Sequence, residues 1–299
     1  MWPAANFWKP STTTRSPEVT GTWQSVTATS IEFIPAAPFI PTVTETVTIP
    51  GGADGIVAKN GSAMNSTVSF SFGIANGDTL RLQELLAQLN YLPLSFAPSG
   101  APPPVTETAL DQPGTFTWRW STLPPNLTSL WKQGQGNVIT KGALMSFQLN
   151  NHLTTDAVAG AKVWSALLSP NAIGATGTYN YVLVSKTLPQ NLTLYENGAP
   201  AFTSIPVNTG VPKADTVDGT FPVFEHVTES RMVGTNVDGS HYDDPHVPWA
   251  SYFNGGDALH AYPRASYGFP QSNGCVEVPE PAAAAVFPLT PIGTLVTVS

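Results

Sequence analysis

The chain has 299 residues, of which 41% are hydrophobic and only 11% are charged. The apolar fraction suffices for packed cores and excludes global disorder, while 25 glycines and 29 prolines exclude a coiled coil and favour strands and turns. The formal net charge of −8 excludes nucleic acid as a partner, because binding it needs a basic surface that releases counterions.

Neither membrane insertion nor a disulfide is expected within this chain. No apolar run reaches the roughly 18 residues of a membrane-spanning helix. The first residues, Met1-Trp2-Pro3, start no signal-peptide pattern, so we expect neither an export signal nor an anchor here. The one cysteine, Cys275, has no internal partner and is either a buried apolar side chain or a nucleophile.

The N-terminal part of the chain is expected to be a tether followed by a β domain. Residues 1–17 are rich in Trp, Pro and Thr, as in a linker. Apolar and small polar residues alternate over 43–49 and again over 68–74, which is the period of half-buried strands. We therefore predict a small sandwich of the immunoglobulin type over residues 18–76, with the role of a spacer.

The pattern becomes helical over residues 77–170. Asp78 is a suitable cap for a helix whose leucines form one apolar stripe. Two further helices are expected at residues 141–150 and 160–168, after a proline-rich insert from Pro98 to Pro125. Residues 171–178 are rich in Gly, Ala, Pro and Thr and are expected to be a linker.

This helical segment resembles a peptidoglycan-binding module of three helices. The resemblance rests on residues 82–92 (LQELLAQLNYL), 139–148 (ITKGALMSFQ) and 160–167 (GAKVWSAL). It implies a contact with cell-wall glycan. The alternative is a plain helical domain whose leucines form only its core.

Residues 179–299 are predicted to form a third domain that is mostly β. Its first strands lead to Asn197-Gly198, a strong hairpin signal, and only residues 281–287 have a helical pattern. The expected fold class is therefore a mainly β protein of several domains. It comprises an immunoglobulin-like sandwich, a short helical module and a mostly β third domain.

The third domain carries the reactive side chains. Cys275 follows Gly274, which lets the backbone approach a substrate and leaves an amide for an oxyanion. His260 ends a strand-like segment 15 residues earlier, and the loop between them is able to return the chain. A neighbouring imidazole lowers the pKa of a thiol, so we expect a thiolate nucleophile.

Two other readings of these residues are weighed against the catalytic one. Cys275 and His260 would each be ordinary core residues in a domain without chemistry. His241 and His246 flank Asp243 and Asp244, a composition that suits zinc, but the spacing matches no known ligand pattern. We therefore expect a solvated acidic loop there, and neither a metal nor a cofactor.

The third domain resembles the L,D-transpeptidase family of the YkuD type. The resemblance rests on residues 253–260 (FNGGDALH) and 268–277 (GFPQSNGCVE), which fit a histidine followed by a Ser-x-Gly-Cys motif. Residues 207–210 (VNTG), 216–221 (TVDGTF) and 289–298 (LTPIGTLVTV) fit other family strings. The match spans residues 179–299.

The sequence departs from the family pattern at four positions. Ala261 stands where a glycine usually follows the histidine, and Asn273 stands where a second histidine is common. Val217 replaces a proline of structural importance only. Glu277 replaces an arginine or asparagine, which puts binding of a substrate carboxylate at this position in doubt.

The resemblance implies acyl transfer through a thioester. Cys275 would attack the carbonyl after the third residue of a peptidoglycan tetrapeptide stem and expel D-alanine. His260 would act as base and then acid, oriented by the Ala261 carbonyl. The amides of Asn273, Gly274 and Cys275 would hold the oxyanion. Of the remaining site residues, Ser272 would shape this turn and Tyr242 would face the substrate.

An amine of a second stem would then resolve the thioester and form a 3→3 cross-link. An L,D-carboxypeptidase that uses water instead, and a non-catalytic wall-binding protein, are the alternatives. The expected partners are peptidoglycan stem peptides, glycan through the helical module, and carbapenems, which acylate this family. Peptidoglycan lies outside the cytoplasmic membrane, so the resemblance implies an exported cell-wall protein with a role in wall organisation and cell shape.

Overall fold

The computed structural model describes residues 14–16, 18–27, 30–52, 55 and 63–299, so most of the predicted tether at 1–17 lies outside it. The chain forms two compact units. The N-terminal unit comprises Met1–Arg81, Pro98–Pro113 and Ala159–Pro170, and the C-terminal unit comprises Leu82–Ala97, Gly114–Val158 and Asn171–Ser299. No helix within the described ranges is both long and apolar enough to cross a membrane.

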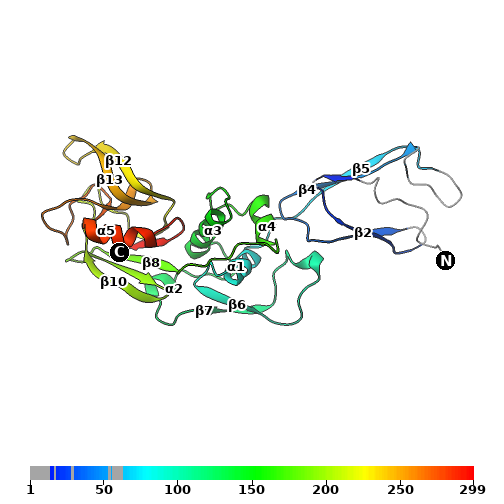
Figure 1. Ribbon diagram of the computed structural model, residues 1–299, viewed down its shortest axis with the longest axis horizontal. Coiled ribbons are helices and arrows are strands. Elements are labelled where there is room, and N and C mark those ends of the chain that lie inside the picture. Colours follow the sequence, from blue (N-terminus) through cyan, green and yellow to red (C-terminus); the bar gives the residue numbers. More distant parts are fainter. Residues whose placement is uncertain (1–13, 17, 28–29, 53–54, 56–62) are drawn as a thin grey trace. The chain divides into compact units, whose positions relative to one another are not determined.

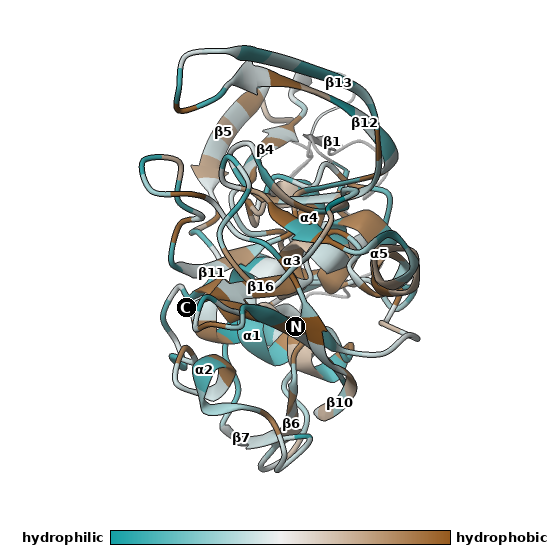
Figure 2. Cartoon of the chain, turned by 90° about the vertical axis from the view of Figure 1, so that its left-hand side faces the viewer, coloured by the Kyte–Doolittle hydropathy of each residue, from teal (hydrophilic) through white to brown (hydrophobic). Residues whose placement is uncertain are grey.

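The N-terminal unit contains two small antiparallel sheets. One has the strand order β1 (Thr14–Ser16), β4 (Thr44–Ile49), β5 (Val68–Gly73), and the other pairs β2 (Gly21–Ser25) with β3 (Ile31–Pro35). Both alternating segments are strands, as predicted. The apolar residues of β5, visible as bands in Figure 2, are largely exposed. The immunoglobulin-like identity of this region remains a prediction.

The three predicted helices are present. They are α1 (Thr79–Gln88), α3 (Val138–Asn150) and α4 (Ala161–Leu167). The Asp78 carboxylate accepts the Leu80 amide at 2.6 Å, and Asn137 accepts the Thr140 amide at 3.0 Å, so polar caps begin α1 and α3. The sequence analysis missed the elements around the proline-rich insert. These are β6 (Leu94–Pro98), η3 (Val105–Glu107), β7 (Gly114–Trp118) and α2 (Pro125–Thr128).

Two glutamines of the helical motif strings are buried structural residues. Gln83 of α1 donates to the Lys132 and Gln135 carbonyls and to Thr140 Oγ1 at 2.9–3.0 Å, and it accepts the Gly134 amide at 2.7 Å. Gln148 of α3 is fully buried and bonds Asp156 and the backbone of the loop that follows. These two glutamines of the peptidoglycan-binding resemblance therefore serve to hold neighbouring loops in place.

Besides the β6–β7 pair, the C-terminal unit contains two larger sheets, which come entirely from residues 180–298. The first is five-stranded, in the order β10 (Ala199–Pro206), β9 (Asn191–Glu196), β8 (Asn180–Ser185), β16 (Leu295–Val298), β11 (Gly219–Pro222). The second is four-stranded, in the order β12 (Glu225–Thr235), β13 (His241–Asn254), β14 (Asp257–Ala261), β15 (Val276–Val278). Helix α5 (Glu280–Val286) and turn η4 (Phe287–Leu289) follow β15. The chain is thus mainly β, as expected, and β12 and β13 form one long hairpin (Figure 1).

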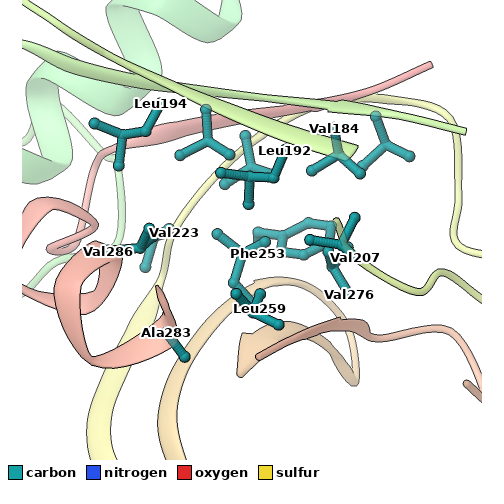
Figure 3. Close-up of a cluster of buried hydrophobic side chains, with 14 of the residues drawn as sticks. Val184, Leu192, Leu194, Val207, Val223, Phe253, Leu259, Val276, Ala283 and Val286 are labelled. Carbon is teal, nitrogen blue, oxygen red and sulfur yellow. The ribbon is translucent and has the colours of Figure 1, made fainter. Parts of the chain in front are cut away.

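A single apolar core joins these two sheets. Val184 and Leu192 of the first sheet lie opposite Phe253 and Leu259 of the second, and all four are at most 3% exposed (Figure 3). Val276 of β15 belongs to the same core. Because alternate residues of a strand face opposite ways, this packing turns the intervening residues of β14 and β15 away from the core.

We predict that Gln83→Ala lowers the free energy of unfolding by about 2 kcal/mol, because it leaves buried backbone groups without partners. Urea denaturation measures this change. Gln88→Ala is the matched control on the same helix, since Gln88 is exposed. Equal effects of the two substitutions would contradict an anchoring role for Gln83.

Candidate active site

The register between β14 and β15 sets the geometry of the site. These strands are parallel, with Leu259 opposite Val276 and His260 opposite Glu277. Leu259 and Val276 face the core, so His260 and Glu277 face the other side of the sheet. Cys275 directly precedes Val276 and its side chain therefore emerges on the same side as His260.

A cavity of about 540 Å³ lies on this face. Cys275, His260, Ser272, Asn273 and Tyr242 all line it, so the structure brings together five of the seven predicted site residues. The other two are Ala261, which acts through its backbone, and Gly274, which is buried in the turn before Cys275. Residues from the long hairpin, the β14 strand and the loop after it complete the walls.

His260 is held in one orientation. Its side chain is buried, and Nδ1 lies 2.9 Å from the Ala261 carbonyl oxygen. A carbonyl only accepts hydrogen bonds, so Nδ1 carries the proton and Nε2 keeps its lone pair. Burial lowers the pKa of His260, which keeps the imidazole neutral and able to take a proton at neutral pH.

Cys275 is a neutral thiol in this site. It is partly exposed, and its Sγ–H lies 3.6 Å from the Gly256 carbonyl oxygen, which accepts it. Burial raises the pKa of Cys275 to about 12, and the carboxylates of Asp257 and Glu277 add to the effect. The expectation of a lowered thiol pKa is therefore wrong, because the imidazole is itself neutral and the nearby charges are negative.

The turn before Cys275 requires glycine at position 274. Gly274 has φ +118°, and a Cβ there would lie 2.4 Å from Asp257 Oδ1. Ser272 Oγ accepts the Gly274 amide at 3.2 Å and donates to the Cys275 carbonyl at 2.5 Å. The Gly274 amide is thus occupied here rather than free for an oxyanion, contrary to the expectation from the sequence.

Backbone hydrogen bonds from the segment at 207–211 hold this turn in place. The Ser272 amide donates to the Thr209 carbonyl at 3.0 Å, and the Val211 amide donates to the Ser272 carbonyl at 2.9 Å. Thr209 exchanges hydrogen bonds with the buried side chain of Gln190. The VNTG string therefore has a structural role in fixing the turn that carries Cys275.

The long hairpin contributes the far wall of the cavity. Tyr242 of β13 lines it, and burial together with the nearby Asp244 carboxylate raises the pKa of its phenol. The Asn273 amide group donates to Asn236 Oδ1 in the hairpin turn at 2.6 Å. His241 and His246 of β13 contact Thr235 and Glu229 respectively, at the exposed side of the same hairpin.

Sequence analysis missed Arg264 as a member of this site. Arg264 lies in the loop after β14, lines the cavity and forms a bidentate ion pair with the buried Glu277. The position where the family has arginine or asparagine is therefore acidic here, and the positive charge beside it belongs to Arg264 in the loop after β14. Loop residues carry no periodic pattern, so only the unusual Glu277 signalled that a partner was needed.

This arrangement suits nucleophilic attack on a carbonyl. Cys275 and His260 line one cavity, and a neutral imidazole is able to remove a thiol proton as the sulfur attacks. Among the described residues, no group of three or more His, Cys, Asp or Glu side chains is arranged to hold a metal ion.

Residues 179–298 match the family model of the YkuD L,D-transpeptidase catalytic domain. The chain therefore carries an L,D-transpeptidase catalytic domain of the YkuD type. No curated protein matches the chain significantly.

Several solved structures are similar to the chain. An L,D-transpeptidase from Mycobacterium smegmatis is 21% identical over 44% of this chain and 64% of that protein, with a TM-score of 0.38. The catalytic domain of an E. faecium L,D-transpeptidase is 25% identical over 40% of this chain and 96% of its own length, with a TM-score of 0.36. L,D-transpeptidase 3 from Mycobacterium tuberculosis, in complex with a faropenem-derived adduct, is 12% identical over 96% of this chain and 81% of its own, with a TM-score of 0.37.

We predict that the Cys275 thiol of the folded protein reacts slowly with iodoacetamide at pH 7. Because its pKa is raised to about 12, the rate should rise roughly tenfold per pH unit up to pH 10 without a plateau. The rate of alkylation, followed by intact mass, measures this. The same chain unfolded in urea is the control and should titrate near the ordinary cysteine value of about 8.5. A plateau below pH 8 in the folded protein would indicate a thiolate–imidazolium pair instead.

Proposed function

We propose that this protein is a peptidoglycan L,D-transpeptidase that forms 3→3 cross-links through an acyl-enzyme on Cys275. The observation that carries the proposal is the pair formed by Cys275 and His260. His260 lies on β14 and Cys275 directly precedes β15, the adjacent parallel strand. Both residues line one cavity, and the imidazole Nδ1 is fixed on the Ala261 carbonyl. The match of residues 179–298 to the catalytic family supports the same chemistry.

In the first half-reaction a donor tetrapeptide stem binds with its third carbonyl against Cys275. His260 Nε2 takes the thiol proton while Sγ forms a bond to the carbonyl carbon. The amides of Asn273 and Cys275 donate to the oxyanion, a contribution of about 3 kcal/mol for each well-placed donor. The imidazolium then gives its proton to the leaving nitrogen, the C–N bond breaks, and D-alanine departs from the thioester.

In the second half-reaction the amine of an acceptor stem attacks the thioester. His260 takes a proton from the amine as the new C–N bond forms, and it returns a proton to the departing sulfur. The enzyme regains its neutral thiol and neutral imidazole. Water in place of the amine would make the same site an L,D-carboxypeptidase.

The other partners follow from this assignment. We propose that the protein acts outside the cytoplasmic membrane, where peptidoglycan lies, in wall organisation and cell shape. A glycan contact through the predicted helical module rests on its sequence resemblance alone, since Gln83 and Gln148 of that resemblance are buried.

Incubation with a disaccharide-tetrapeptide tests the reaction. We expect a cross-linked dimer and released D-alanine, and an intact-mass adduct on Cys275. Cys275→Ala should abolish all three, and His260→Gln should slow acylation by about 10²- to 10⁴-fold, because it removes the base. His246→Gln, an exposed histidine of the hairpin, is the matched control. D-Alanine release without dimer would establish hydrolysis, and no adduct at all would overturn the enzymatic assignment.

The pH profile of acylation follows from the neutral imidazole. The pKa of His260 lies below the ordinary histidine value of about 6.5, so the base remains competent at pH 6.5 and is lost only as the pH falls further. Stopped-flow acylation by the tetrapeptide between pH 4.5 and 8 measures this acidic limb. A limb centred above pH 7 would show that the imidazole is stabilised as a cation, against this account.

Carbapenem labelling tests the nucleophile independently of substrate. A carbapenem carries a strained amide that a cysteine opens, so we expect one adduct of the drug's mass on Cys275. Intact mass followed by peptide mapping locates the adduct, with Cys275→Ala as the control. Failure to label under conditions that acylate another L,D-transpeptidase would remove the support for a thioester mechanism.

A further inference from the structure

The ion pair next to the nucleophile has an unusual arrangement. Glu277 lies two residues after Cys275 on the same face of the sheet, and its side chain is only 5% exposed. Arg264 Nε donates to Glu277 Oε2 at 2.8 Å, and Nη2 donates to Oε1 at 2.6 Å. The two side chains therefore form a parallel fork, which fixes the plane of the guanidinium.

The guanidinium has donors to spare. Arginine has five N–H groups, one on Nε and two on each terminal nitrogen. Glu277 takes the Nε hydrogen and one from Nη2, and the Gln271 carbonyl accepts the second Nη2 hydrogen at 3.3 Å. The two Nη1 hydrogens remain, with no partner among the described residues.

Arg264 lies where a bound substrate would contact it. Its side chain is 30% exposed and lines the cavity that holds Cys275 and His260. The guanidinium carbon lies 4.7 Å from the centre of the Tyr262 ring, so one face is covered and the group is held rigidly. A buried ion pair adds little stability on its own, so a structural role does not account for the two unused Nη1 hydrogens of a residue that lines the cavity.

The cavity suits a carboxylate one residue beyond the attacked carbonyl. Cys275 and Arg264 line the same cavity of about 540 Å³. One extended residue of a peptide spans only about 3.5 Å. A donor stem whose attacked carbonyl lies at Cys275 would therefore keep its terminal carboxylate in the cavity that Arg264 lines.

We propose that Arg264 binds the terminal carboxylate of the donor tetrapeptide through its Nη1 hydrogens, and that Glu277 is the residue that positions Arg264 for this task. The inference rests on the proposed function, because it assigns a part of that substrate to a part of that site. The departure at Glu277 is then a relocation of the cation rather than a loss of carboxylate binding.

The experiment compares a tetrapeptide donor with the same donor amidated at its terminal carboxyl. For the unsubstituted protein we expect amidation to lower kcat/KM for acylation by about 10- to 100-fold, the worth of a hydrogen bond to a charged group. In the double variant Arg264→Gln/Glu277→Gln, which keeps hydrogen-bonding side chains without charges, the two donors should react equally. Arg264→Lys keeps the charge and loses the fork, so it should retain an intermediate preference.

The matched control is the second arginine–carboxylate fork of this unit. Arg231 lines the same cavity and donates to Asp243 at 2.8 and 2.6 Å with the same bidentate geometry, but both side chains are at least half exposed and therefore better solvated. The double variant Arg231→Gln/Asp243→Asn should keep the full preference for the free carboxylate. Loss of the preference in this control would move the carboxylate site to Arg231 and overturn the inference.

The remaining outcomes separate the two proposals. If neither donor acylates the unsubstituted protein, the proposed function fails. If both donors react equally well with it, the function stands and carboxylate binding by Arg264 is wrong. A further outcome is that the double variant Arg264→Gln/Glu277→Gln lowers kcat/KM for acylation by the same factor with both donors and lowers the melting temperature. The ion pair then only orders the loop after β14, which also overturns the inference.

Discussion

The parallel pairing of β14 with β15 is the interaction on which the rest of the site depends. Its register sends Leu259 and Val276 into the core and leaves His260 and Cys275 on the opposite face. The core thus fixes the catalytic geometry, because shifting either strand by one residue would exchange the buried and exposed sets. Residues 207–210 and the Ser272 hydroxyl add hydrogen bonds that hold the turn before Cys275 in place.

The electrostatic state of the site favours a general-base mechanism over a preformed ion pair. Burial disfavours the charged forms of both Cys275 and His260, and the neighbouring carboxylates oppose the thiolate further. The thiol is therefore almost wholly protonated at neutral pH, and in the proposed mechanism it loses its proton only as it attacks a carbonyl. Such a resting state protects a lone cysteine against oxidation, because the thiolate is the species that reacts with oxidants.

The sequence was sufficient for the parts of the protein where pattern and chemistry are local. The short motif around Cys275 and the position of His260 predicted one cavity, and the leucine stripe with Asp78 predicted α1. The state of the thiol was not predictable, because it depends on burial of the sulfur and on the charges of Asp257 and Glu277, which only the three-dimensional fold brings near it. Arg264 was missed for the same reason, since its partner lies 13 residues away across a loop with no periodicity. The β6–β7 pair escaped notice because prolines masked its alternation.

The way in which β14 and β15 are joined has an evolutionary consequence. The strands are placed by pairing and core packing, and the turn at 272–275 is held by its own hydrogen bonds. The rest of the connection, residues 262–271, therefore does not by itself determine where the thiol and the imidazole lie. Insertions and deletions in this connection cost little as long as the pairing survives. This loop is therefore free to diverge, and because Tyr262, Arg264 and Gln271 line the cavity, its divergence reshapes the cavity wall while Cys275 and His260 stay where they are.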